Sequence, residues 1–168
     1  MNIQHVLQTL SRNKVESLLI GGMAYLLNHN GPLTYDMDFF VRDTPDNLSR
    51  LNTALRELEC EWGPKEAFWK PVAETPEWLT WQPVYCLTSP HGAIDLYRAV
   101  KGLEGGFDAC FSRAILRPIS DDDAFFCLSD DDMLRCQEAL PEEQRRLNRV
   151  HVLKEAINRR QRVESLKA

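Results

Sequence analysis

The sequence predicts an α/β (α+β) fold in which a small mixed β-sheet is flanked by helices and followed by C-terminal helices. One observation is that segments with apolar residues every three or four positions alternate with short apolar runs, which is the pattern of helices alternating with strands. The other is that 168 residues, 43% hydrophobic and 27% charged, suit one globular core. We therefore expect a single domain over 1–168, with an α/β core over 1–128 and a helical segment over 129–168.

The N-terminal third is predicted to alternate helix and strand. Gly21-Gly22 ends the first apolar run as a turn, and Asn30-Gly31-Pro32 ends the second helix. In the strand that follows, Asp36 and Asp38 share a face, because side chains two residues apart in a strand point the same way. The expected elements are a helix over 2–13, a strand over 15–20, a helix over 23–30, a strand over 36–41, and a helix that starts within 43–46 and ends near residue 60.

The middle of the chain is rich in tryptophan and proline. Residues 61–83 hold all four tryptophans and four of the nine prolines, so regular helix is not expected there. The segment forms either a pocket wall or lid, or a cover over a sheet edge, and the large area that aromatic rings bury favours the cover. Two strands over 79–88 and 93–100, joined through Pro90-His91-Gly92, predict a hairpin.

The C-terminal third is predicted to end in helices. Residues 107–116 fit either helix or strand, and 124–128 are expected as a short strand. Ser129 has the position of an N-cap for a helix that Pro141 interrupts and that resumes directly after it. Residues 144–168 carry eight Lys or Arg against two Glu, although the whole chain has a net charge of −5. Such a segment is either a solvated helix face, which is favoured, or a surface for phosphate backbones.

Composition also limits the class of protein. No apolar run approaches the length of about 20 residues that spans a membrane. The N-terminal residues lack the basic start and apolar stretch of a secretory leader, so we expect a cytoplasmic protein with no membrane partner. The five cysteines are scattered without a CxxC pair, which predicts buried thiols rather than a disulfide framework or a zinc site.

Three aspartates and two glycines carry the chemistry that the sequence suggests. Gly21 and Gly22 follow a buried strand, so backbone N–H groups at the start of the next helix can approach a phosphate closely. Asp36 and Asp38 follow after an interval of thirteen residues. Asp95 lies in another apolar strand, where burying a carboxylate is costly unless it is paired or bound to a metal. Carboxylates grouped in this way bind hard cations and suit phosphoryl transfer.

This pattern resembles the nucleotidyltransferase superfamily with the DNA polymerase beta-like catalytic fold. The motifs Ile20-Gly21-Gly22, Asp36-Met37-Asp38 and Ile94-Asp95-Leu96 match those of the superfamily. Residues 18–41 and 129–157 are similar to the minimal bacterial and archaeal members, which include abortive-infection toxins of toxin–antitoxin pairs. The resemblance implies a catalytic site for two Mg²⁺ ions formed by Asp36, Asp38 and Asp95, and nucleotide-binding residues Gly21, Gly22, Thr34 and Arg135.

The roles of Asp95, Arg135 and Tyr35 need separate comment. The resemblance implies that Asp95 also takes the proton of the acceptor hydroxyl. Arg135 meets either a phosphate or a carboxylate. Tyr35, beside the carboxylates, either stacks on a base or packs beneath the strand, and packing is favoured.

The function that the resemblance implies is transfer of a nucleoside monophosphate from a nucleoside triphosphate, such as ATP, to a hydroxyl acceptor. The acceptors are RNA or tRNA, a protein side chain or a small molecule; the basic C-terminal segment favours nucleic acid, and the toxin-like branch implies an antitoxin partner. The alternative is a nucleotide-binding or protein-interaction module without turnover, since Pro32 and Leu147-Asn148-Arg149 replace an Arg and a Lys-Asp pair of many minimal members. A third hypothesis is an interaction subunit that binds a partner through 61–83.

Overall fold

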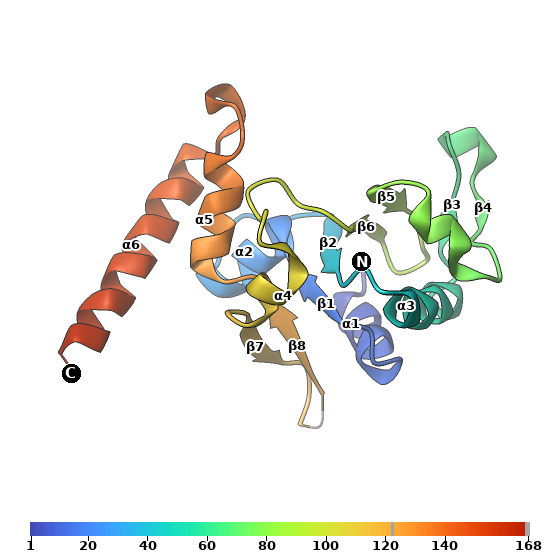
Figure 1. The fold of residues 1–168 in the computed structure, drawn as a ribbon, viewed down its shortest axis with the longest axis horizontal. Helices are drawn as coiled ribbons and strands as arrows, with labels where there is room; N and C mark the ends of the chain where they lie inside the picture. Colours follow the sequence, from blue (N-terminus) through green and yellow to red (C-terminus); the bar gives the residue numbers. More distant parts are fainter. Residues whose placement is uncertain (122, 167–168) are drawn as a thin grey trace.

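A computed structural model describes residues 1–121 and 123–166, and in it a mixed six-stranded sheet is flanked by helices (Figure 1). The helices are α1 (Ile3–Arg12), α2 (Gly21–His29), α3 (Pro45–Glu57), α4 (Gly106–Phe111), α5 (Asp130–Glu138) and α6 (Leu147–Ser165). The strands are β1 (Ser17–Leu19), β2 (Asp36–Val41), β3 (Glu61–Trp62), β4 (Lys70–Pro71), β5 (Val84–Leu87), β6 (Ala93–Tyr97), β7 (Ile115–Pro118) and β8 (Ala124–Cys127). The predicted α/β class with C-terminal helices is therefore confirmed.

Strand β2 lies in the interior of the sheet, whose order is β5-β6-β2-β1-β8-β7. It pairs antiparallel with β1 and parallel with β6. Two hairpins, β5-β6 and β7-β8, form the outer parts, and β8 runs parallel to β1 with Leu19 opposite Cys127. Strands β3 and β4 form a separate ribbon. Both neighbours of β2 therefore hold its backbone in place.

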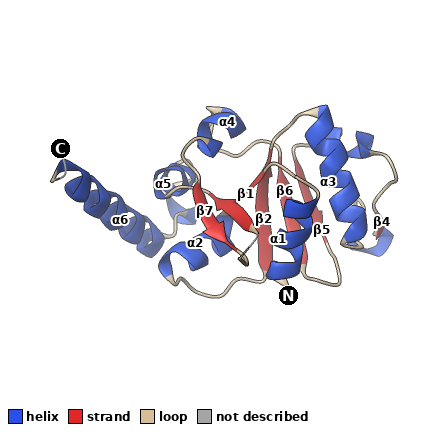
Figure 2. Ribbon diagram, turned by 90° about the horizontal axis from the view of Figure 1, so that it is seen from below, coloured by secondary structure: helices blue, strands red, loops and turns tan. Residues whose placement is uncertain are grey.

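The two faces of β2 have different surroundings because its side chains alternate. Phe39 and Val41 point to the face that α1 and α3 cover, where they meet Leu51 and Leu55; Figure 2 shows both helices lying across this face. On the opposite face Phe40 packs edge-on against a phenylalanine of α4 at 5.5 Å. The apolar core thus fixes the register of the strand and leaves its aspartates on the face away from α1 and α3.

Helix starts follow the local signals in the sequence. Thr44 accepts a hydrogen bond from the backbone N–H of Asn47, and Pro45 occupies the first turn of α3. Ser129 accepts one from the N–H of Asp132 at the start of α5. The predicted helix starts at these positions are confirmed. The helix after the first strand begins at Gly21 rather than at residue 23, because the two glycines form its first turn, with Gly21 at a positive φ of +66°.

The tryptophan-rich segment covers the β5 edge of the sheet. Trp78 is buried, stacks on Trp62 with ring centroids 5.5 Å apart, and meets Tyr85 of β5 edge-on at 5.0 Å. Its indole N–H donates to the side-chain oxygen of Asn52 on α3 at 2.8 Å. This is the edge-covering arrangement that the sequence favoured.

Two further predicted boundaries are wrong, and one segment that was left open is resolved. The strand expected from residue 79 begins at Val84, because Pro76 opens a 3₁₀ turn through Thr80. Residues 107–116, which fitted either structure, divide into α4 and β7. The helix expected to resume directly after Pro141 starts only at Leu147, since a separate 3₁₀ turn intervenes.

Helix α6 packs beside α5 at one end of the sheet, and its C-terminal half extends away from the body (Figures 1 and 2). Every residue from Asn158 to Leu166 is exposed. Lys167, which was counted in the basic segment, and Asp122 lie outside the described residues. Among the described helices, none combines the length and the apolar character that crossing a bilayer requires.

Candidate metal centre and adjoining cleft

The three predicted aspartates meet on the face of the sheet opposite α1 and α3. Parallel pairing places Asp38 of β2 directly opposite Asp95 of β6, and Asp36 shares the face of Asp38 because it lies two residues earlier. One carboxylate oxygen from each lies within 4.8 Å of the others. The structure therefore assembles the carboxylates that the motif spacing predicted to act together.

Burial and mutual repulsion raise the pKa of two of these carboxyl groups. Burial, followed by the charges of Asp36 and Asp95, raises the pKa of Asp38 from 3.8 to about 6. The backbone N–H of Gly22 and the hydroxyl of Tyr97, 3.4 Å away, donate to Asp38 and limit this rise. The pKa of Asp95 is also raised, mainly by burial. A divalent cation would relieve this repulsion, and an all-oxygen donor set suits Mg²⁺, so the residues fit the ion that the sequence predicts.

The two glycines permit the start of α2 to lie against the carboxylates. Gly21 has φ +66°, and a Cβ there would lie 1.9 Å from an oxygen of Asp38. A Cβ on Gly22 would lie 2.9 Å from the hydroxyl oxygen of Thr34, which itself donates to Asp36. The structure thus brings Gly21, Gly22 and Thr34 to the cluster, and the positive end of the α2 dipole faces the same space.

A cleft with a volume of about 430 Å³ opens beside Asp38 and Gly21. This size lies in the range of small-molecule sites. One wall comes from the strand ends and the loop after β6, and the other from α5 and the start of α6. The apolar lining residues include Ile20, Val84, Val100, Leu128, Met133 and Leu140. The polar ones include Tyr97, Lys101, Gln137 and Arg149.

Arg149 is a functional candidate that the sequence analysis did not select. Its side chain, only 9% exposed, lines the cleft with its guanidinium carbon 4.5 Å from the ring centre of Tyr25. Among residues 1–121 and 123–166 it makes no ion pair and no side-chain hydrogen bond. Burial lowers its pKa, and the charge of Asp38 opposes that shift. Its guanidinium nitrogens are not fully buried but reach the cleft, so Arg149 can bind an anionic ligand there.

The sequence contains a signal for Arg149 that patterning alone can reveal. The buried face of α6 is formed by Arg149, Leu153 and Ile157. These positions are four residues apart, so an arginine interrupts an otherwise apolar helical stripe. An arginine in that position indicates a charge held inside the protein rather than on its surface.

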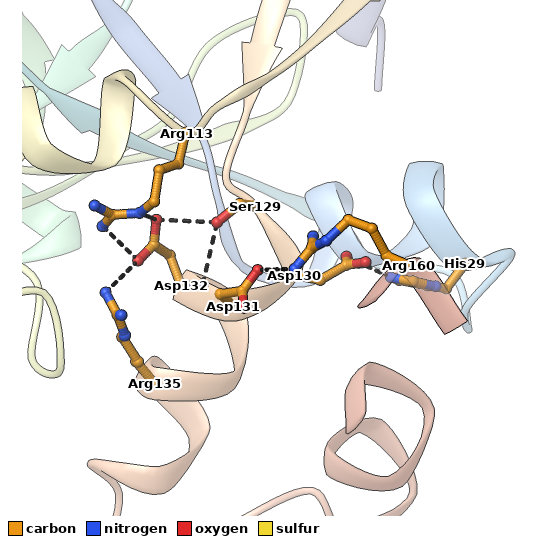
Figure 3. A network of polar contacts seen from close by, with 8 residues as sticks. All are labelled: His29, Arg113, Ser129, Asp130, Asp131, Asp132, Arg135 and Arg160. Atoms are coloured by element: carbon orange, nitrogen blue, oxygen red, sulfur yellow. Dashed lines mark hydrogen bonds and ion pairs between the residues drawn. The ribbon is translucent and has the colours of Figure 1, made fainter. Parts of the chain in front are cut away.

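Arg135 is not brought to the aspartate cluster. Its guanidinium donates to Asp132 at 3.0 Å, and Arg113 binds the same carboxylate at 2.8 Å (Figure 3). Both arginines line a separate pocket that does not contain Asp38. Of the two partners considered for Arg135, the structure shows the carboxylate.

Two further expectations do not hold. Tyr35, expected to pack beneath its strand, is 82% exposed next to the cluster. Cys86, expected to be a buried thiol like Cys60, Cys110 and Cys127, is exposed and lies opposite Asp95 in the β5-β6 pair. Both residues lie near the aspartates, where an open surface replaces the usual apolar covering.

No protein-family model matches this chain, and a search of curated proteins finds no match. The chemistry of the cluster and of the cleft is therefore inferred from their own residues. These combine a carboxylate triad with a glycine-led helix start, and Gly21 and Asp38 line one cleft together with Arg149.

Proposed function

We propose that this protein is a magnesium-dependent nucleotidyltransferase that moves a nucleoside monophosphate from a nucleoside triphosphate to a hydroxyl acceptor. The observation that carries the proposal is the convergence of Asp36, Asp38 and Asp95 at the start of α2. These carboxylates would hold Mg²⁺, which supplies charge neutralisation and activation of an oxygen nucleophile when bound.

The positive groups around the cluster support a triphosphate as the ligand. Backbone N–H groups at the start of α2 favour an anion, and Gly21 allows that backbone to come close. Arg149 supplies a largely buried guanidinium to the same cleft that Asp38 lines. A polyphosphate bound between these groups places its base in the apolar part of the cleft.

The reaction is a displacement at the α-phosphorus. The acceptor oxygen forms a bond to that phosphorus, the bond from it to the oxygen leading to the β-phosphorus breaks, and pyrophosphate leaves. Asp95 receives the hydroxyl proton. The acceptor is a hydroxyl of RNA or tRNA, of a protein or of a small molecule.

Thermal unfolding with each of ATP, GTP, CTP and UTP, with and without Mg²⁺, tests this function. A nucleotide that binds the native state raises the unfolding midpoint. We expect a Mg²⁺-dependent rise that is lost in Asp36→Ala and retained in Asp46→Ala, which removes an exposed carboxylate of α3.

Turnover is then measured as pyrophosphate release with RNA and protein acceptors. Release that depends on both Asp36 and Mg²⁺ supports the transferase. Binding without release for any acceptor supports a module that has the site but not the activity. No shift with any nucleotide contradicts the proposal.

A further inference from the structure

Gln137 of α5 has a fixed amide orientation inside the cleft. The side chain is 8% exposed, and its oxygen accepts a hydrogen bond of 3.0 Å from the backbone N–H of Arg146. A backbone N–H can only donate, so the atom that faces it must be the amide oxygen. The amide nitrogen therefore occupies the other position, where it has no hydrogen-bond acceptor among the described residues.

The surroundings of Gln137 suit an uncharged, flat ligand group. It follows Met133 by one helical turn, and Leu140 lies one turn further along, so apolar side chains flank it on the cleft wall. Val100 and Leu128 add further apolar surface to the cleft. In the proposed function the phosphates lie near Asp38 and the start of α2, which leaves the base as the part of the nucleotide that reaches Gln137.

We infer that Gln137 selects nucleotides whose base presents a carbonyl oxygen, as guanine and uracil do, over those that present an amino group at the same position. This inference rests on the proposed function, because it needs a nucleotide in the cleft. The amide nitrogen offers two N–H donors and no acceptor. A carbonyl oxygen accepts from it, whereas an amino group opposes donor to donor and leaves both groups unpaired.

Bases with an amino group bind more weakly because they leave this amino group and the amide nitrogen of Gln137 unpaired. A polar group that loses its partner in a buried site keeps its full desolvation cost, and hydrogen-bonding sites reject analogues without the matching group more strongly than apolar pockets do. We expect a preference of about tenfold for the carbonyl-bearing base, the lower part of the range for amide recognition of base edges.

The test compares nucleotides that differ at one position of the ring. Inosine triphosphate and ATP differ by oxygen against an amino group at C6, and UTP and CTP differ in the same way at C4. Calorimetric dissociation constants are measured for all four with Mg²⁺ on the wild-type chain. We expect inosine triphosphate to bind about tenfold more tightly than ATP, and UTP about tenfold more tightly than CTP.

Two variants assign the preference to Gln137. Gln137→Glu keeps an oxygen for the Arg146 N–H but turns a second oxygen towards the ligand, so both ratios should fall below one. Gln137→Met removes the polar contact, so both ratios should approach one. The control Gln144→Glu adds the same charge at an exposed site outside the cleft and should keep the wild-type ratios. A loss of packing in a variant weakens all four nucleotides together and leaves the ratios unchanged.

The outcomes separate this inference from the proposed function. If ATP and CTP bind as tightly as their partners, or if the wild-type ratios persist in Gln137→Glu, the inference is wrong while nucleotide binding stands. If no nucleotide shows Mg²⁺-dependent binding, the proposed function is wrong and the inference falls with it.

Discussion

At the scale of single residues, Asp38 is stabilised in its protonated form by the fold. Its pKa of about 6 in the native protein exceeds its ordinary value of 3.8. Between these two values the unfolded chain binds fewer protons than the native state does, so stability falls as the pH rises through this interval and stays reduced above it. Without a cation, the carboxylate therefore destabilises the protein at neutral pH.

The first prediction concerns Asp38→Asn. At pH 7.5 without divalent ions, removing the repelled charge should raise the free energy of unfolding by about 1–3 kcal/mol, whereas at pH 3.5 the variant and the wild type should be nearly equal. Urea unfolding at both pH values measures this. Mg²⁺ should stabilise only the wild type, and should do so less as the pH falls through 6. A less stable variant at pH 7.5 would contradict the assigned repulsion.

The second prediction separates backbone strain from displacement of Asp38. Gly21→Ala and Gly106→Ala both place a side chain at positive φ, which costs about 1–2 kcal/mol, but only at Gly21 does the new Cβ meet Asp38; nothing lies within 4 Å at Gly106. Both variants should unfold at lower temperature. Mg²⁺-dependent nucleotide stabilisation should disappear in Gly21→Ala and persist in Gly106→Ala, as measured by thermal unfolding. Equal loss in both would show that strain alone explains the effect.

The residue-level prediction from sequence succeeded where spacing determines position. Asp36 and Asp38 face one way in any strand, and the motif distance from Gly22 placed them beside α2. The spacing along α6 marks Arg149 as facing inward, but its contact with Tyr25 depends on how α6 packs against α2. Arg135 was assigned from resemblance, but its helix turns it towards Asp132 instead.

At the scale of elements, the start of α5 is held by a buried carboxylate. Asp132 is fully buried and binds Arg113, Arg135 and the hydroxyl of Ser129 (Figure 3). The first of these arginines precedes β7, so the network ties α5 to the far part of the sheet. Since α5 forms one wall of the cleft, its position determines where Gln137 lies.

The third prediction compares adjacent aspartates of α5. Asp132→Asn removes the charge that two arginines share and should lower the free energy of unfolding by about 3 kcal/mol. Asp131→Asn loses only the partly exposed pair with Arg160 and should cost less than about 1 kcal/mol. Chemical denaturation of both variants measures the difference. Similar values would contradict the central role of Asp132.

Helices and strands were predicted correctly where the residues that determine them lie within the element itself. The bounds of β2 match because its apolar run and its aspartates are both in the strand itself. The segment before β5 has the composition of a strand, but Pro76 and the packing of Trp78 on Tyr85 form a 3₁₀ turn instead. Tertiary packing outweighed propensity there.

At the scale of the whole molecule, the cleft joins parts that are distant in sequence. Its metal end comes from β2 and β6, and its other wall from α5 and the start of α6. The sequence predicted a small mixed sheet and C-terminal helices, but not the strand order, because strand pairing between distant segments leaves no local pattern. Ligand binding should therefore connect the core with the C-terminal helices.

The fourth prediction tests that connection through Arg149. Arg149→Leu should weaken triphosphate binding by about 10- to 100-fold, the loss of one charge-assisted hydrogen-bonding group. The stability of the ligand-free protein should be unchanged or higher, because a buried charge without an ion pair is replaced by an apolar side chain. Calorimetry and urea unfolding measure the two effects. Arg159→Leu, on the exposed part of α6, should change neither, and a triphosphate affinity unaffected by Arg149→Leu would contradict this assignment.

The parallel pairing of β1 with β8 has a consequence for synthesis on the ribosome. The edge of β1 at Leu19 is paired only after Cys127 of β8 has been synthesised. The N-terminal part of a chain leaves the ribosome first. During most of translation the edge of β1 is therefore open, and an open edge can pair with another chain. Chains that end before β8 should accordingly aggregate more readily than the full-length chain.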